Sequence, residues 1–456
     1  MGLTAAGIGS GLDVESLISQ MVTLQKSPLK ALQASASSLD TKISAYGKLK
    51  SLMSTLSDAA TNLAKKETWK TTTAASSNAA VTVAVTDANA LAGTSEVTVE
   101  ALARGHSQAS GLMAADAKFG GSLELKIGGN TVPPITIQPG SSMGDVVAAI
   151  NEKNTGVVAS VMTDADGQQR LVLRSKDTGA NAKFTLTATG DTNLMKLDSS
   201  DGKTVKQDAQ NARIVVNGIS VESATNEFKN TLPGLNITVS QLTTAAASVT
   251  VKTDTEGLKK SLQTFMDAYN ALNDALVSST KYDAESKVAG TLQGDSTAVS
   301  MANSLRSAIA GTVSGIGGVN RLSELGIQIA KGGKLSFGTS TTDKANLEKA
   351  LSNPESLSAV FASAGTEGQG DTQGLAVRMQ ALTKSMLDFE GTFDTKTASL
   401  TAQKKSNTDA QDRVNDRAVA FEARMRAQYT ALDTKMASYS TLSTYMSQQV
   451  SQWNKS

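Results

Sequence analysis

The stretch LKALQASASSLDTKISAYGKLKSLMSTLSDAATNL, residues 29–63, decides how the chain is organised. Its apolar residues recur at steps of three and four, close to the ~3.5-residue period of a coiled-coil seam. They are Leu29, Leu32, Ala36, Leu39, Ile43, Tyr46, Leu49, Met53, Leu56, Ala60 and Leu63. Pro28 stands directly before the run, where proline suits the first turn of a helix. The pattern predicts a long amphipathic helix that needs a partner to cover its apolar side.

The far end of the chain repeats this pattern. The apolar positions there are Val414, Ala418, Phe421, Met425, Tyr429, Leu432, Met436, Tyr439, Leu442, Met446, Val450 and Trp453. Polar and charged residues lie between them, as on the solvated side of an amphipathic helix. Neither terminal helix can bury its apolar side alone. Two arrangements stay open: the helices pair only with each other inside one monomer, or their outermost parts also pack against other subunits.

The segment GIGSGLDVESLISQMV, residues 7–22, begins with three glycines spaced two apart. A phosphate-binding loop would need a strand before the glycines, G-x-G-x-x-G spacing, or a following Gly-Lys-Ser or Gly-Lys-Thr. The segment has none of these, because only MGLTAA precedes it. We therefore favour a flexible leader joined to a helix that Asp13 caps. One face of that helix would carry Leu17, Ile18, Met21 and Val22.

Between the terminal helices, apolar and polar residues alternate, which is typical of β-strands. The alternation runs through VTVAV, SEVTVEAL, LELKIGG, ITIQPG, GVVASVMTDADGQQRLVLRS, KFTLTATG, ARIVVNGISVES and LPGLNITVS. SSMGDVVAAINEKNTG predicts one short helix among these strands. DADG, residues 164–167, lacks the further acidic positions of a calcium loop and is interpreted as a hairpin turn. Helical periodicity returns at EGLKKSLQTFMDAYNALNDALV and TAVSMANSLRSAIAG, so both ends of the chain should meet in a shared helical stalk.

The composition limits the chemistry that the chain can perform. Its 456 residues include 43 Lys and Arg against 42 Asp and Glu, which gives no basic field for nucleic acid. It has no Cys, so disulfides, thiol nucleophiles and thiolate metal sites are excluded. The single histidine, His106, is interpreted as a polar loop residue without a catalytic role. We expect no cofactor and no metal, although a pair of carboxylates could still form a glycosidase site.

No targeting segment of the usual kind is present. The first lysine is Lys26, so the N-terminus lacks the basic region of a cleaved signal peptide. No apolar run approaches the ~20 residues of a membrane span, and no membrane insertion is expected. The chain should therefore stay in the cytoplasm or leave by a route that needs no cleaved signal.

Taken together, these segments resemble the flagellar hook-associated protein 2 family, the filament cap proteins, over nearly the whole chain. GIGSGLDVESLISQMV is similar to the family's N-terminal signature, and SMGDVVAAINEKNTGVVASVMTDADGQQRLVLRSKDTGAN resembles the hook-IN repeat of flagellins and hook-associated proteins. DAQNARIVVNGISVESATNEFKNTLPGLNITV resembles the segment that joins two β domains to the stalk. LKKSLQTFMDAYNAL, LSELGIQIAKGGKLSF and LEKALSNPESLSAVF resemble the C-terminal half. One departure is GGKL at residues 332–335, where the family usually has DGKL.

The resemblance implies an α+β multidomain fold. N- and C-terminal helices would form a coiled-coil or helical-bundle stalk, with two β-rich domains inserted between them. The expected parts are an export leader with a terminal assembly helix (1–27), an N-terminal stalk helix (28–70), a β-rich domain (71–105 with 208–255), an inserted β-rich domain with the hook-IN-like motif (106–207), a helical stalk domain (256–410) and a C-terminal coiled-coil assembly helix (411–456).

The resemblance also implies a structural rather than enzymatic function. Such a protein caps the distal tip of the bacterial flagellum, outside the cell, where it retains exported flagellin and promotes its polymerisation. The implied partners are further copies of the chain in a pentameric or hexameric ring, flagellin, hook–filament junction proteins and an export chaperone. Export would use the flagellar type III apparatus, which reads an uncleaved N-terminus. Two alternatives remain: a surface adhesin for host glycans, as a second role, and a carboxylate-based hydrolase.

We expect the assembly interface on the terminal helices. Its predicted residues are Leu12, Leu17, Met21, Leu432, Met436, Tyr439, Leu442 and Met446. The C-terminal stripe is longer than the short helix around Leu17 and Met21 can cover. Part of the stripe should therefore meet another protein.

Overall fold

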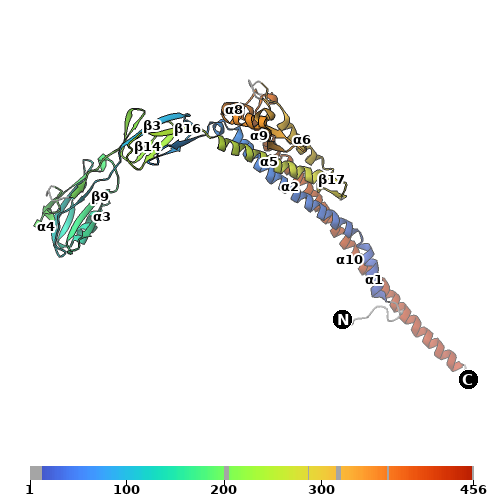
Figure 1. The fold of residues 1–456 in the computed structure, drawn as a ribbon. Helices are drawn as coiled ribbons and strands as arrows, with labels where there is room; N and C mark the ends of the chain where they lie inside the picture. Colours follow the sequence, from blue (N-terminus) through green and yellow to red (C-terminus); the bar gives the residue numbers. More distant parts are fainter. Residues whose placement is uncertain (1–12, 200–204, 286, 315–319, 367–368, 454–456) are drawn as a thin grey trace. The chain divides into compact units, whose positions relative to one another are not determined.

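The computed structural model describes residues 13–199, 205–285, 287–314, 320–366 and 369–453. The chain divides into two compact units (Figure 1). Residues 1–69 and 259–456 form one unit, which we call the helical unit. Residues 70–258 form the other, the β-rich unit. The expected α+β fold, with helices from both ends and β-rich domains between them, is confirmed.

The helical unit is built mainly from helices of both chain ends. They are α1 (Val14–Gln25), α2 (Pro28–Ala64), α5 (Thr255–Thr280), α6 (Ser296–Ala310), α7 (Thr341–Leu351), α8 (Pro354–Ala362), α9 (Leu375–Leu387) and α10 (Thr392–Trp453), with the 3-10 turns η1 (Lys66–Lys70), η3 (Leu322–Leu325) and η4 (Gly370–Thr372). Two hairpins join them: β17 (Tyr282–Asp283) with β18 (Val288–Ala289), and β19 (Ile327–Ile329) with β20 (Leu335–Phe337).

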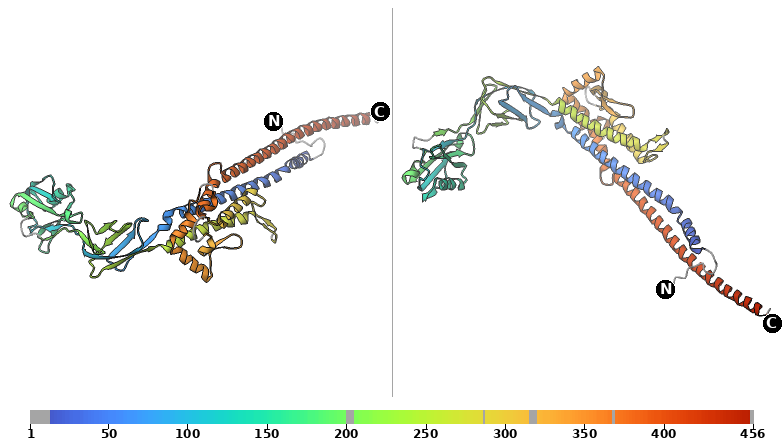
Figure 2. Two further views of the ribbon diagram at one scale, coloured as in Figure 1. Left: turned by 90° about the horizontal axis from the view of Figure 1, so that it is seen from above. Right: turned by 60° about the horizontal axis from the view of Figure 1, so that its bottom comes forward.

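Helices α2 and α10 lie side by side (Figures 1 and 2). α2 begins at Pro28 and buries the later positions of its predicted seam: Leu39, Tyr46, Leu49, Met53, Leu56, Ala60 and Leu63. α10 contributes Phe393, Leu400, Val414 and Ala418 to buried positions. Because α10 contains no Gly or Pro, it runs without interruption past the boundary expected between residues 410 and 411.

In the body of the helical unit, α8 and α9 pack against α2. Trp69, just after α2, is buried and its Nε1 donates a hydrogen bond to the Leu63 carbonyl at 2.9 Å. Its ring stacks on Phe361 of α8 at 5.3 Å between centroids. Phe265 of α5 meets the same Phe361 ring edge-on at 6.5 Å. An aromatic cluster therefore ties α2, α5 and α8 together.

The described part of the β-rich unit has two larger hydrophobic cores, each between antiparallel strands, and a small cluster of Ala90, Leu235 and Val251. The first involves a five-stranded sheet in the order β1 (Thr72–Ser76), β16 (Ala247–Thr253), β3 (Gly93–Ala101), β12 (Ala212–Val216) and β13 (Ile219–Ser223), and a three-stranded sheet of β14 (Glu227–Lys229), β15 (Leu235–Val239) and β2 (Val81–Val85). Alternate residues of these strands, such as Val97, Val99, Ile214 and Ile237, form the core. The alternation in the sequence thus places one face of each strand inside.

The second core belongs to the residues inserted between β3 and β12. One sheet contains β10 (Phe184–Gly190), β5 (Phe119–Ile127), β6 (Asn130–Thr131) and β7 (Ile135–Ser141), and the other contains β11 (Val205–Gln207), β4 (Ser107–Ala109), β9 (Gln169–Ser175) and β8 (Val157–Thr163). The helices are α3 (Met143–Glu152) and α4 (Thr192–Met195), with the 3-10 turn η2 (Ala180–Ala182). Phe119, Val146, Leu171 and Leu186 are among the buried core residues.

Local chemistry explains two predicted features of this insertion. Ser142 and Asp145 form a capping box at the start of α3, which satisfies two backbone N–H groups of the first turn. The DADG segment connects β8 and β9, and Asp164 Oδ1 accepts hydrogen bonds from the backbone of Asp166 and Gln168. The hairpin interpretation of this segment is therefore confirmed.

Candidate assembly surface

A largely buried carboxylate joins three helices where α10 begins beside α2. Asp295 Oδ1 accepts a hydrogen bond from the Tyr46 hydroxyl at 2.8 Å, and Oδ2 lies 2.8 Å from Lys396 Nζ. The same Oδ1 caps α6 by accepting from the backbone N–H groups of Thr297 at 3.0 Å and Ala298 at 3.3 Å. The carboxylate therefore fixes α2 and α10 against the first turn of α6.

The surroundings of this carboxylate shift two pKa values. Burial raises the pKa of Asp295, but hydrogen bonds from Lys396 and Tyr46 outweigh burial and hold it below the ordinary value. Burial, together with the bond to Asp295, raises the pKa of Tyr46 well above that of a free phenol. The neutral phenol and the ionised carboxylate are thus the stable pair.

Three further ion pairs cross between the terminal helices. Lys50 of α2 pairs with Asp394 of α10 at 2.7 Å, and Asp40 of α2 pairs with Lys404 of α10 at 2.5 Å. Farther along, Glu15 of α1 pairs with Arg426 of α10. These side chains are largely solvated, so each pair contributes little stability. Their spacing along α10 nevertheless favours one register of α1 and α2 over others.

Helix α1 packs on α10, and it buries Ile18 of the predicted apolar face together with Val14, which was not predicted. Asp13 caps it as expected, because its carboxylate accepts from the Ser16 N–H at 3.0 Å. The buried side chains are Val14 and Ile18, at i and i+4 on one face. Leu17 is half-buried and Met21 is 37% exposed. Leu12 lies outside the described residues.

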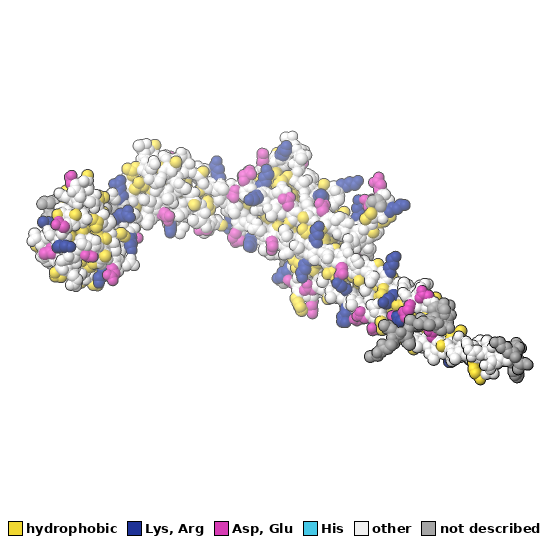
Figure 3. Space-filling model, turned by 90° about the horizontal axis from the view of Figure 1, so that it is seen from below, with side chains coloured by type: hydrophobic (Ala, Val, Ile, Leu, Met, Phe, Trp, Pro, Cys, Tyr) yellow, Lys and Arg dark blue, Asp and Glu magenta, His cyan; other side chains and the backbone are white. Residues whose placement is uncertain are grey.

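Beyond Arg426, α10 continues for residues 427–453, about 40 Å of helix at ~1.5 Å per residue. The five predicted residues on this part, Leu432, Met436, Tyr439, Leu442 and Met446, are 40% to 65% exposed. Tyr445 and Val450 are exposed as well, and residues 436–453 contain no charged side chain. Figure 3 shows apolar side chains on the surface toward this end of the helix. We call residues 427–453 the α10 tail.

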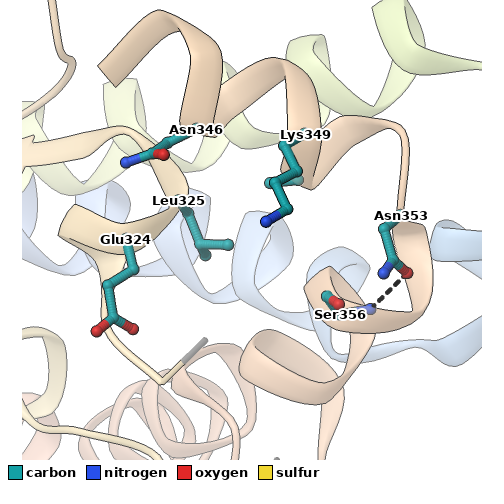
Figure 4. A pocket seen from close by; sticks show the side chains of 7 residues that line it. Glu324, Leu325, Asn346, Lys349, Asn353 and Ser356 are labelled. Atoms are coloured by element: carbon teal, nitrogen blue, oxygen red, sulfur yellow. Dashed lines mark hydrogen bonds between the residues drawn. The ribbon is translucent and has the colours of Figure 1, made fainter. Parts of the chain in front are cut away.

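One pocket of the helical unit does not resemble a catalytic site. A pocket of about 360 Å³ lies between η3, α7 and α8, with Glu324, Lys349 and Asn353 around it (Figure 4). Its carboxylate, Glu324, already accepts hydrogen bonds from the backbone N–H groups of Asn320 and Arg321. The pocket therefore does not present the pair of carboxylates that a glycosidase needs.

The described residues offer neither a metal-binding cluster nor a membrane-spanning helix. No group of three or more His, Asp or Glu side chains in the described part of the chain could hold a metal ion. Among the helices that the structure describes, none is both long and apolar enough to cross a membrane.

His106 lies in a loop, as the sequence predicted, but its side chain is buried. It precedes β4 in a loop, but it is only 2% exposed, and its ring meets Phe184 edge-on at 4.5 Å. Its backbone N–H donates to Ser175 Oγ at 2.9 Å. The polar neighbours in RGHSQAS concealed this burial, because the loop is covered by a strand far away in the sequence.

Models of known protein families match three regions of the chain. The C-terminal model of flagellar hook-associated protein 2 matches residues 209–441, just over half of the chain. The N-terminal model of the same family matches residues 10–106, and the flagellin hook IN motif matches residues 122–177. The chain belongs to the flagellar hook-associated protein 2 family. The match to the hook IN motif covers most of the strands inserted between β3 and β12.

Relatives of this family are similar over nearly the full length. Flagellar hook-associated protein 2 of Escherichia coli (strain K12) is 30% identical, with 98% of each chain covered. The B-type flagellar hook-associated protein 2 of Pseudomonas aeruginosa PAO1 is also 30% identical, with 93% of each chain covered. The solved D1-D2-D3 domains of the E. coli flagellar cap protein FliD are 27% identical. That structure covers 78% of this chain and 99% of its own, with a TM-score of 0.60.

Proposed function

We propose that this protein is the structural cap at the distal tip of the bacterial flagellar filament, where it retains exported flagellin and promotes its polymerisation. It acts outside the cell as a ring of five or six copies, without enzymatic activity. The flagellar type III apparatus exports it with an uncleaved N-terminus, assisted by an export chaperone. Membership of the hook-associated protein 2 family and the likeness to a flagellar cap structure support this function.

The observation that carries the proposal is the uncovered α10 tail. Its apolar stripe continues the seam of the α2–α10 pair past the start of α1, where the described residues offer no further partner helix. Burying one Leu, Met or Tyr side chain contributes about 1.5–3 kcal/mol, so a few such residues suffice for docking. We assign Leu17, Met21 and the five C-terminal residues to contacts with neighbouring cap subunits, flagellin or the hook–filament junction proteins.

The tail also suits a cap that must move as the filament grows. Residues 436–453 combine apolar side chains with Ser, Thr and Gln and carry no charge. Contacts of this kind are modest and can be exchanged for equivalent ones on the next subunit. A large, tightly complementary interface would hold the cap in one place.

The test replaces Leu442 and Met446 with Asp, which puts two unpaired charges into the stripe. Because both side chains are exposed in the monomer, its thermal unfolding should not change. In a strain that carries only this variant, export should continue and filaments should be short or absent. Flagellin should then accumulate in the medium, which immunoblotting of filament and supernatant fractions measures.

The matched control is Ser440→Asp with Thr444→Asp. These exposed residues add the same charge to the same turns but point to the opposite side of α10. The control should assemble normal filaments. Normal filaments with the Leu442 and Met446 variant would refute the assembly role of the stripe, and so would a large drop in the melting temperature of the purified monomer.

A further inference from the structure

The turn between α9 and α10 holds an aromatic ring out in solvent. Phe389 is 88% exposed, more than any other large apolar side chain in the described part of the chain. Its neighbours Asp388 and Glu390 are exposed too. Neither carboxylate forms an ion pair within the described residues. The tip of this turn therefore presents an uncovered ring between two negative charges.

The backbone of the turn fixes this presentation. The Asp388 N–H donates to the Lys384 carbonyl at 2.8 Å, and the Gly391 N–H donates to the Asp388 carbonyl at 2.8 Å. A Cβ on Gly391 would lie only 2.7 Å from the Asp388 carbonyl oxygen, so the turn is closely packed. Glu390 has a φ of 59°, which is unfavourable for a residue with a side chain. Such residues persist where the surrounding structure holds them, and they are concentrated at functional sites.

The pocket between η3, α7 and α8 has a size and lining that suit an aromatic ring. Its volume of about 360 Å³ lies within the range of ~300–1,000 Å³ for ligand pockets. Leu325 and Ala350 contribute apolar surface to its lining. In Figure 4, the side chain of Lys349 extends toward Leu325. An ammonium group beside apolar surface favours an aromatic ring, because the cation is attracted to the ring face.

The charges of the turn and the pocket are opposite. Lys349 is exposed and forms no ion pair within the part of the chain that the structure describes. The pocket's carboxylate, Glu324, is already hydrogen-bonded to two backbone N–H groups. A ring that enters the pocket brings Asp388 and Glu390 toward the ammonium group of Lys349. The ring and its flanking charges therefore favour the same contact.

The ring and the pocket do not meet within one copy, because Phe389 is exposed while the pocket is open. Both belong to the helical unit. Two different, complementary surfaces on one molecule give a head-to-tail contact, and repetition of that contact can close into a ring. We propose that Phe389 of one copy inserts into the pocket between η3, α7 and α8 of the next copy. The inference rests on the proposed function in one point, the ring of copies, and it names a contact that joins them.

The variant Phe389→Ala tests the contact. A single ring in a pocket buries less surface than a stable interface, so assembly should depend on protein concentration. Sedimentation velocity over a concentration series measures the concentration at which half of the full-length chain is assembled. Phe389→Ala should raise that concentration at least about tenfold. Because the ring is exposed in the monomer, the melting temperature should not change. The control Val419→Ala removes a side chain that is 63% exposed on α10 and should change neither quantity.

A charge exchange identifies the surface that receives the turn. Lys349→Glu should weaken assembly, and so should Asp388→Lys combined with Glu390→Lys. The variant with all three substitutions should assemble better than either, because opposite charges face each other again. A triple variant that assembles no better would contradict the pairing of this turn with this pocket.

The failure of this contact can be told from the failure of the ring. If the unaltered chain assembles and Phe389→Ala assembles equally well, the contact is refuted and the proposed cap function stands. If the unaltered chain stays monomeric up to its solubility limit, the ring is refuted together with the contact.

Discussion

Replacing Asp295 with Ala should loosen the base of the stalk. The substitution removes the N-cap of α6, which is worth about 1 kcal/mol. It also leaves the Tyr46 hydroxyl without its acceptor inside the protein, which costs about 1–3 kcal/mol. Lys396 loses its partner too, but its side chain is 24% exposed and water compensates in part. We expect the free energy of unfolding of the helical unit to fall by about 2–4 kcal/mol.

A natural tryptophan of the helical unit, Trp69, reports this unfolding. The chain has two tryptophans, Trp69 and Trp453, and Trp69 is buried against Phe361. In a Trp453→Phe background, urea titrations followed by tryptophan fluorescence therefore measure the environment of Trp69. The slope of the transition should stay unchanged while its midpoint decreases.

The exposed ion pair between Lys50 of α2 and Asp394 of α10 is the matched control. The side chains of Lys50 and Asp394 are 46% and 37% exposed, so Lys50→Ala should cost less than 1 kcal/mol. Tyr46→Phe should cost about 1.5 kcal/mol in the natural sequence and little in the Asp295→Ala background. If Asp295→Ala lowers the free energy of unfolding no more than Lys50→Ala does, the carboxylate does not hold α2, α6 and α10 together.

Three further predictions concern pH, His106 and a helix cap. Because the folded pKa of Asp295 lies below its unfolded value, its contribution is present above about pH 4 and lost as the pH falls through the folded pKa; urea midpoints measured between pH 2 and 7 should show this loss, and Asp295→Ala should reduce it. His106→Ala removes a buried ring beside Phe184, so it should lower the stability of the β-rich unit by about 3 kcal/mol in thermal unfolding, with no change in metal content. Ser142→Ala breaks the capping box of α3 and should cost about 1 kcal/mol, with faster amide hydrogen exchange at the start of that helix.

Periodic segments of the sequence predicted the corresponding elements of the fold. The heptad run after Pro28 predicted α2, whose seam is mostly buried from Leu39 onward, and the alternating runs predicted strands such as β9 and β12, in which alternate residues are buried. Short strands such as β4, β6 and β11 gave no signal. Two or three residues carry no periodicity. β4 and β11 pair with strands far away in the sequence, and β6 forms a tight hairpin with β5.

The candidate site was predictable only in part, for a similar reason. The repeating stripe identified the apolar residues of the α10 tail, whose exposure is the central structural finding about them. Tyr46 was predicted as one more apolar seam residue, but its hydroxyl bonds to Asp295, 249 positions away. No local pattern links Tyr46, Asp295 and Lys396, which meet only after three helices have packed. Val14 was missed because it stands directly after the capping Asp13, where the apolar run had not yet become periodic.

The distribution of contacts along α10 suggests how one helix serves both stability and assembly. Near Lys396 the helix is fixed by a buried carboxylate, and at Arg426 it is positioned by an exposed ion pair. Past that point the five predicted apolar residues are 40% to 65% exposed, and an isolated helix gains little stability from its own hydrogen bonds in water. Docking of the α10 tail must therefore also stabilise its helical form, and part of the contact energy is used for that ordering. The affinity of the α10 tail for its partner is therefore lower than the buried apolar area alone would give. The tail can then be released while the helices around Asp295 and Lys396 stay folded.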